Sequence, residues 1–242
     1  MIEPVSTNFA ELARRIESVG LAVRGAFHPE PDEFAEWLAG PAPGTIVLVG
    51  FTGSAQWPAF QASGEARDGL PDPLDRWSRR VLGALGAELQ ASCWYPSGAL
   101  PQPPFQRLAL RSEPVHRSPI GLLIHPQWGL WHAYRGALGM ADRLALPAFD
   151  AAAAHPCDGC VERPCLHTCP VAALRSGSLE VHTCAAHVQS AAGRDCRELG
   201  CRARRACPLG AQYRYCADQA RFHMQSFLRA LKSAAPRPHR PT

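Results

Sequence analysis

The amino-acid sequence predicts an α+β fold in two parts, a sandwich of helices and strands over residues 1–150 and a small, mostly helical domain over residues 151–233. Helix and strand patterns alternate in the first part, as in layered α/β packing. Strand patterns then stop, and nine of the ten cysteines fall between Cys157 and Cys216. With 242 residues, 46% of them hydrophobic and 19% charged, the chain is long enough for both parts to fold. The final segment, 234–242, is rich in proline and is expected to be disordered.

The first elements of the sandwich are a helix and two strands. Apolar residues recur at helical spacing over 9–16, between Thr7 as a suitable N-cap and Gly20 as a suitable stop. A strand is expected to follow at 21–26. The segment 45–49 is short, β-branched and continuously apolar, which predicts a strand buried on both faces and therefore central in a sheet.

A second helix is predicted to begin where Asp72, as N-cap, precedes Pro73 at the first helical position. Its buried stripe is expected to consist of Leu74, Trp77, Val81, Leu82 and Leu85. The chain then returns as a strand at 91–95. Two later apolar segments, 121–125 and 130–138, flank a turn and predict a hairpin.

The second part is expected to be helical. Segments 183–192 and 219–231 both have helical patterns, and Pro170 is suited to open a short helix over 171–174.

Composition narrows the location and partners of the protein. No segment is apolar over the roughly 18 residues that span a bilayer, and the N-terminus lacks the basic and apolar regions of a secretory signal. We therefore expect a cytoplasmic protein without a membrane partner. The net charge of +4 divides into 12 basic and 15 acidic residues over 1–150, and 13 basic and 6 acidic residues over 151–242. Only one of the 25 basic residues is a lysine, which is typical of codon bias and does not favour a nucleic-acid partner.

Two cysteine runs carry the chemistry of the second part. The first has the form Cys157-x2-Cys160-x4-Cys165-x3-Cys169-Pro170, a lengthened version of the bacterial ferredoxin run. In that run, three cysteines hold one [4Fe–4S] cluster and the fourth reaches across to a second cluster. A two-cluster arrangement requires a second run of similar design, and Cys196-x4-Cys201-x5-Cys207-Pro208 supplies it.

The crossed pattern of ligation assigns eight cysteines to two clusters. The first cluster takes Cys157, Cys160, Cys165 and Cys207, and the second takes Cys169, Cys184, Cys196 and Cys201. The two remaining cysteines, Cys93 and Cys216, are expected to be buried structural thiols.

Zinc and disulfides are the alternatives for this cysteine set. Four-cysteine zinc sites usually pair two Cys-x2-Cys knuckles, whereas only one such knuckle is present. Disulfide frameworks belong to short exported domains. Each cluster with four thiolates adds a charge of about −2, so nearby arginines are expected to act as counter-charges. These are Arg194, Arg197, Arg202, Arg204 and Arg205.

The cysteine layout resembles the double-cluster, ferredoxin-type domain of epoxyqueuosine reductases and of reductive dehalogenases. Residues 121–136, with weaker support from 72–75, are similar to the flavin-reductase-like (nitroreductase-like) domain of CblC-type cobalamin-processing chaperones. The resemblance implies that cobalamin contacts the loops around this segment, with His125, Trp131, Tyr134 and Arg135 as candidate contacts. The chain lacks the Arg-Asp-Tyr-His-like segment and the C-terminal helical repeats of epoxyqueuosine reductases, so tRNA modification is not expected.

The combined pattern predicts an iron–sulfur redox protein that passes electrons through two [4Fe–4S] clusters to a cofactor, a corrinoid or less favourably a flavin, or to a substrate in the N-terminal domain. Such a protein is an oxidoreductase if it also reduces a small molecule. Two alternatives stay open, a cobalamin-binding and cobalamin-processing chaperone and a plain ferredoxin-like electron carrier. An electron donor protein is the expected partner. No catalytic acid stands out among the carboxylates of the first part.

Overall fold

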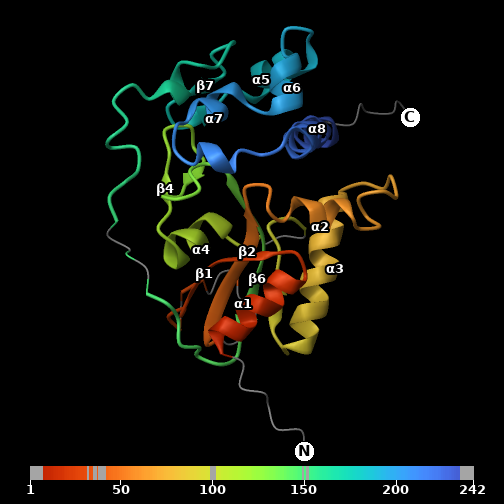
Figure 1. Cartoon of the computed structure of the whole chain (residues 1–242), viewed down its shortest axis with the longest axis vertical. Helices are drawn as coiled ribbons and strands as arrows, with labels where there is room; N and C mark the ends of the chain where they lie inside the picture. The colour runs from red at the N-terminus through yellow and green to blue at the C-terminus, as the bar shows by residue number, and fades with distance from the viewer. Residues whose placement is uncertain are drawn as a thin grey trace, which may run out of the picture.

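The computed structural model describes residues 8–31, 33, 34, 37, 42–98, 102–148, 150 and 153–234. Thr7 and most of the expected tail lie outside these residues. The N-terminal elements, shown in Figure 1, are α1 (Phe9–Ser18), β1 (Ala22–Phe27), β2 (Thr45–Thr52), α2 (Trp57–Gln61), α3 (Pro73–Glu88), β3 (Ser92–Trp94), α4 (Phe105–Ser112), β4 (His116–Arg117), β5 (Leu123–Ile124) and β6 (His132–Met140). The C-terminal elements are η1 (Pro164–Leu166), β7 (Leu174–Arg175), β8 (Ser178–Leu179), α5 (Val181–Gln189), α6 (Arg194–Leu199), α7 (Arg202–Ala206), η2 (Ala211–Tyr213) and α8 (Ala217–Ala234).

The larger sheet has four antiparallel strands in the order β1-β2-β6-β3. Strand β2 is central, as its continuous apolar run predicts, and it is buried along almost its whole length. Its register with β6 pairs Val47 with Leu138, and its register with β1 pairs Val47 with Ala26. The mixed α and β content expected from the sequence is confirmed.

Helices cover both faces of this sheet because side chains alternate along β2. Val47, Val49 and Phe51 pack in one cluster with the apolar faces of α1 and α3. Ile46 and Leu48 point to the opposite face, where α4 packs against them. Figure 1 shows α3 and α4 on opposite sides of the sheet.

Two helix starts differ from the sequence prediction. Helix α1 is capped by Asn8, whose side chain accepts a hydrogen bond from the Glu11 N–H at 2.8 Å, and not by Thr7. Pro73 opens α3 as expected, but Asp72 adopts a left-handed φ of +49° and its side chain makes no capping hydrogen bond. The backbone turn therefore sets the start of α3, and the Asp72 carboxylate is not engaged as a cap.

The predicted hairpin between 121–125 and 130–138 is wrong. The turn forms, with His125 and Gly129 exchanging two backbone hydrogen bonds of 2.9 Å, but the strands on either side separate. Strand β5 pairs with β4 in a small sheet, whereas β6 pairs with β2 and β3. A nine-residue buried strand obtains two hydrogen-bonded neighbours inside the large sheet, which a single hairpin partner could not provide.

The C-terminal part is helical with one short hairpin that the sequence did not predict. Helices α5 and α8 confirm the two longer helix predictions. The helix expected at 171–174 is absent, because Ala172 adopts a left-handed φ of +49° and leads into β7. In the described part of the chain, no helix is both long and apolar enough to cross a membrane.

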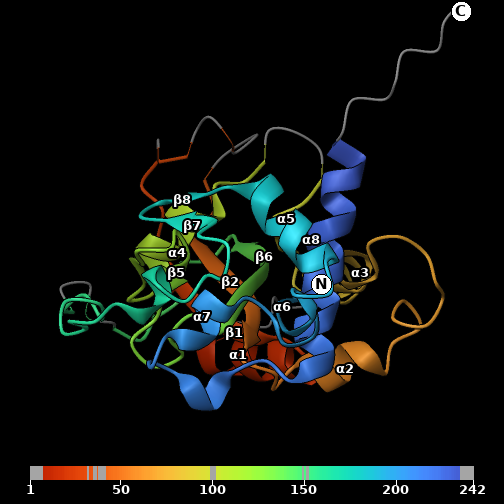
Figure 2. The same cartoon turned by 90° about the horizontal axis from the view of Figure 1, so that it is seen from above.

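The C-terminal part lies over one end of the large sheet, as the view from above in Figure 2 shows. Helix α8 joins it to the first part through aromatic contacts. The Phe222 ring lies 5.3 Å from Trp57 and 5.4 Å from Phe60, both on α2, centroid to centroid. Ile120 and Ile124 pack around Cys165 and Cys207 in a small separate cluster.

Candidate metal centres

Four cysteines line a first cavity of about 40 Å³ between η1 and the end of α7. They are Cys157, Cys160, Cys165 and Cys207. Cys157 and Cys160 come from the loop that leads into η1, Cys165 lies within η1, and Cys207 sits at the C-cap of α7. Among the described residues, the rest of the lining is mainly proline and aliphatic side chains, with Arg163 as the one charged residue.

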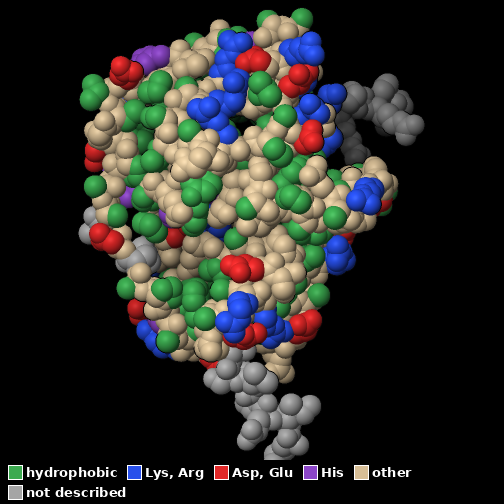
Figure 3. Space-filling model, viewed as in Figure 1, with side chains coloured by type: hydrophobic (Ala, Val, Ile, Leu, Met, Phe, Trp, Pro, Cys, Tyr) green, Lys and Arg blue, Asp and Glu red, His purple; other side chains and the backbone are tan. Residues whose placement is uncertain are grey.

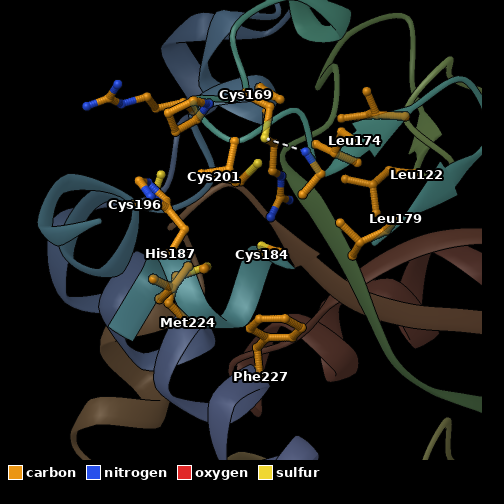
Figure 4. Close-up of a pocket in the computed structure, with 18 residues that line it drawn as sticks. Leu122, Cys169, Leu174, Leu179, Cys184, His187, Cys196, Cys201, Met224 and Phe227 are labelled. Carbon is orange, nitrogen blue, oxygen red and sulfur yellow. Dashed lines mark hydrogen bonds between the residues drawn. The ribbon is translucent and has the colours of Figure 1, made fainter. Parts of the chain in front are cut away.

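A second cavity of about 250 Å³ is lined by the other four cysteines, Cys169, Cys184, Cys196 and Cys201. Cys184 lies on α5, Cys196 on α6, and Cys201 at the N-cap of α7. Figure 4 shows these side chains around the cavity with Leu122, Leu174, Leu179, Met224 and Phe227. The Ala173 N–H donates to Cys169 Sγ at 3.3 Å.

The two cavities draw on both cysteine runs in a crossed manner. Cys165 and Cys169 are four residues apart in sequence but line different cavities. Cys201 and Cys207, at the two ends of α7, also line different cavities. The grouping of thiols is therefore the one expected for crossed ligation, while the binding of clusters stays a prediction.

The donor set of each cavity suits an iron–sulfur cluster. All ten cysteines are free thiols. In the described ranges, no three Cys, His, Asp or Glu side chains form a group that could hold a single metal ion. Thiolates around one zinc ion lie about 2.3 Å from the metal and hence about 4 Å from one another, whereas a cube of eight atoms spreads its ligands wider. Four sulfur donors around the mainly apolar second cavity of about 250 Å³ fit the larger group, whereas the first cavity, at about 40 Å³, is smaller than a cube.

Because they are buried, these thiols need a nearby positive charge to lose their protons. Burial and neighbouring cysteines raise the pKa of Cys157 to about 11 and that of Cys184 to about 11. Thiolates are the form that binds metal, and a bound cation offsets both the desolvation and the mutual repulsion.

The two remaining cysteines lie away from both cavities. Cys93 is half-buried, and its thiol donates to the Leu82 carbonyl oxygen at 3.5 Å. Cys216 is exposed, which corrects the expectation of a buried thiol, and its backbone N–H donates to Ser54 Oγ at 2.8 Å. It lies just before α8, where the side chain can point to solvent.

Of the five arginines expected as counter-charges, Arg202 and Arg204 line the second cavity. Arg202 is paired with Asp195 through two hydrogen bonds, and Arg205 bonds the same carboxylate at 2.7 Å. Arg204 donates through Nε to the Leu130 carbonyl oxygen at 3.1 Å. Because this acceptor is neutral, it does not offset the positive charge of Arg204. Figure 3 shows basic and acidic side chains interspersed over this end of the molecule. Arg194 bonds the Glu198 carboxylate, and Arg197 bonds two backbone carbonyl oxygens.

The four residues proposed from the sequence as cofactor contacts do not share one cavity. Trp131 is 2% exposed and packs against both Arg204 and Tyr215, with the guanidinium carbon 4.5 Å from the indole centroid. His125 and Tyr134 belong to a buried polar cluster on one face of the sheet, and Arg135 faces a cavity on the other.

The buried polar cluster is centred on Glu113 and Arg24. Arg24 projects inward from a bulge in β1, and its Nη2 donates to Glu113 Oε2 at 2.8 Å. The Tyr134 hydroxyl donates to the other carboxylate oxygen of Glu113. His125 Nε2 lies 3.9 Å from Glu113 Oε2, and the His125 ring stacks on Trp128 at a centroid distance of 3.9 Å. This cluster has no signature in the sequence, because Arg24 and Glu113 are 89 residues apart along the chain.

Burial shifts the ionisation of this cluster. Desolvation raises the pKa of Glu113 to about 7, although Arg24 and the Tyr134 hydroxyl act to lower it. Desolvation and the charge of Arg24 lower the pKa of His125 to about 4. His125 is therefore neutral in the physiological range.

Arg135 lines a cavity of about 310 Å³, here called the Arg135 cavity, between the start of α3, β6 and α8. Its lining is Asp72, Pro73, Leu74, Asp75, Ala133, Arg135, Phe222, His223 and Ser226. Arg135 Nη2 lies 3.3 Å from Asp75 Oδ1. His223 contributes a buried Nε2 without a hydrogen-bond partner. A single histidine on a helix gives no specific signal, so the sequence alone does not indicate His223 as part of a site.

Comparisons with known proteins give similarity at the level of structure. No family model and no curated protein matches the chain. A solved epoxyqueuosine reductase from Bacillus subtilis superposes with a TM-score of 0.44 at 13% identity, covering 86% of this chain and 67% of that one. The enzyme from Streptococcus thermophilus gives a TM-score of 0.45 at 13% identity, covering 83% and 65%. The chain thus spans about two thirds of the length of these proteins.

The ionisation of Glu113 leads to a prediction on stability. Because its pKa rises from 4.5 to about 7 on folding, the folded protein keeps a proton that the unfolded chain releases in this range. The free energy of unfolding therefore falls as the pH rises from 4.5 to 7, by up to about 3 kcal/mol from this group. Glu113→Gln, which resembles the protonated acid, lacks this contribution. Anaerobic urea unfolding at several pH values measures this effect. The free energy of unfolding of wild type minus that of Glu113→Gln should fall between pH 4.5 and pH 7. If this difference stays constant or rises, the raised pKa of Glu113 is contradicted.

Proposed function

We propose that the protein is an iron–sulfur redox protein that binds two [4Fe–4S] clusters and passes electrons to an acceptor in its N-terminal half. One observation carries the proposal: eight cysteines divide into two sets of four, each set around its own cavity, in the crossed order of a two-cluster ferredoxin run. Such clusters supply one-electron transfer at low potential.

The residues of the chain would hold and shield the clusters. The second cavity is roomy and mainly apolar, and it needs little change to admit a cube. The first cavity, at about 40 Å³, is narrower than a cube, so its thiols must rotate outward on binding. Cys157 and Cys160 lie on a loop and are half-buried, which leaves their side chains room to do so.

We place the electron acceptor in the Arg135 cavity. Its volume of about 310 Å³ is at the lower end of small-molecule sites, which span roughly 300–1,000 Å³. Helix α8 forms a wall of both this cavity, through Phe222 and His223, and the second cysteine cavity, through Met224 and Phe227. The two cavities are therefore separated by about the diameter of one helix, roughly 10–12 Å, a short distance for electron transfer.

A corrinoid is the acceptor that we favour, with Arg135 as the contact. A whole corrinoid exceeds this cavity, so part of the ring system would extend beyond it. The other three candidates, His125, Trp131 and Tyr134, do not line the Arg135 cavity and would act only indirectly, by supporting the elements around it. A flavin, a cobalamin-processing role without net reduction, and a plain electron carrier are distinguished by the binding experiment below.

Iron analysis tests the crossed grouping of the cysteines. Anaerobically purified wild type should contain about eight iron ions per chain. The double variant Cys165→Ala/Cys207→Ala removes two ligands from one cavity and should keep about four. The double variant Cys165→Ala/Cys169→Ala removes one ligand from each cavity, although the two positions are only four residues apart, and should keep almost none.

The matched control is Cys216→Ala, because Cys216 is exposed and lines neither cavity. It should retain the full iron content of wild type. Equal iron loss in the two double variants, or stoichiometric zinc in place of iron in wild type, would overturn the assignment.

Titration of cob(II)alamin tests the acceptor. Binding should shift its absorption spectrum toward the four-coordinate form, and Arg135→Ala should weaken binding about tenfold or more, the loss expected for one charge-assisted hydrogen bond. Arg14→Ala, on the exposed surface of α1, should bind like wild type. Binding of flavin alone would identify a flavin-dependent reductase, and binding of neither would leave an electron carrier; either result contradicts the corrinoid proposal.

A further inference from the structure

The lining of the second cysteine cavity contains a buried polar group that has no hydrogen-bond partner. His187, on α5, lines the cavity, and its Nε2 is buried without a hydrogen-bond partner. Buried ring nitrogens are nearly always paired, because desolvating one without a partner costs about 1–3 kcal/mol. Figure 4 shows His187 between the labels of Cys196 and Met224, at one end of the cavity.

The other polar side chains of this lining already have partners. The Arg202 guanidinium bonds the Asp195 carboxylate through two nitrogens, and Arg204 bonds the Leu130 carbonyl. Among the described residues that line the second cavity, His187 is the one with a buried polar side-chain atom left unpaired. A group that enters this cavity and offers a hydrogen-bond acceptor would give His187 Nε2 the partner that it lacks.

We propose that His187 donates an Nε2–H···S hydrogen bond to the cluster held by Cys169, Cys184, Cys196 and Cys201, and so raises its reduction potential. The inference rests on the proposed function. It makes His187 a positioning and tuning residue, not a ligand, because four thiolates already complete that set. A hydrogen bond to a cluster or cysteine sulfur withdraws negative charge and favours the reduced state.

The first cavity has no equivalent of this donor. Its lining contains no histidine and includes four prolines, Pro119, Pro156, Pro164 and Pro208, which have no backbone N–H. Arginine lines both cavities, Arg163 the first and Arg202 and Arg204 the second, so the His187 donor is the difference that favours reduction of the second cluster. The second cluster is also the one beside α8 and the Arg135 cavity, so electrons that enter at the first cluster move downhill toward the acceptor side.

An anaerobic potentiometric titration followed by electron paramagnetic resonance tests the inference. In His187→Phe, which keeps a planar ring and removes the donor, one of two reduction transitions should move to a more negative potential while the other stays. His187→Gln, which retains an N–H, should remain close to wild type. His182→Phe, at an exposed position of the same helix, should leave both transitions unchanged.

The transition that moves is assigned by the variant Cys169→Ala, which should lack that same transition. Unchanged potentials in His187→Phe, with both clusters present, would overturn the role of His187 and leave the proposed function standing. Loss of half the iron in His187→Phe would make His187 a ligand or a structural residue and would also overturn it. Wild type without any cluster would instead refute the proposed function.

Discussion

The C-terminal part of the chain depends on bringing thiols from two distant runs around the same cavities. Cys165 and Cys207 share a small apolar cluster with Ile120, Ile124 and Leu130, all three from the first part of the chain. Metal binding contributes folding free energy in such segments, because the site does not exist in the unfolded chain. In the proposed function, crossed ligation would tie both runs together twice, with α7 between them. Helix α8 packs on α2 through Phe222 and Trp57, and it forms the wall shared by the second cavity and the Arg135 cavity.

The sequence predicted those features that local patterns specify. The apolar run of β2 indicated a central strand, and the Asp72-Pro73 pair located the start of α3 within a residue. The cysteine spacing, with a proline after the last cysteine of each run, indicated which thiols would share a cavity. The strand and helix predictions succeeded because each depends on residues within one segment of the chain. The grouping of the cysteines matches the two cavities, while their role as cluster ligands stays a prediction.

Features that depend on contacts between distant residues could not be predicted. Arg24 and Glu113 are separated by 89 residues and meet only because a bulge in β1 turns the arginine inward. The hairpin prediction failed for a similar reason, since the partners of β6 are set by the whole sheet and not by the adjacent turn. The Arg135 cavity is built from α3, β6 and α8, and none of these segments has a motif that indicates a shared site.

The most direct test of the account is the Mössbauer spectrum of anaerobic protein enriched in the iron-57 isotope. Two [4Fe–4S] clusters predict quadrupole doublets of delocalised, mixed-valence iron from about eight ions per chain, with no residual mononuclear component. A spectrum of isolated ferrous or ferric ions, or protein that binds zinc but no iron, would contradict the claim that the two four-cysteine cavities are cluster sites.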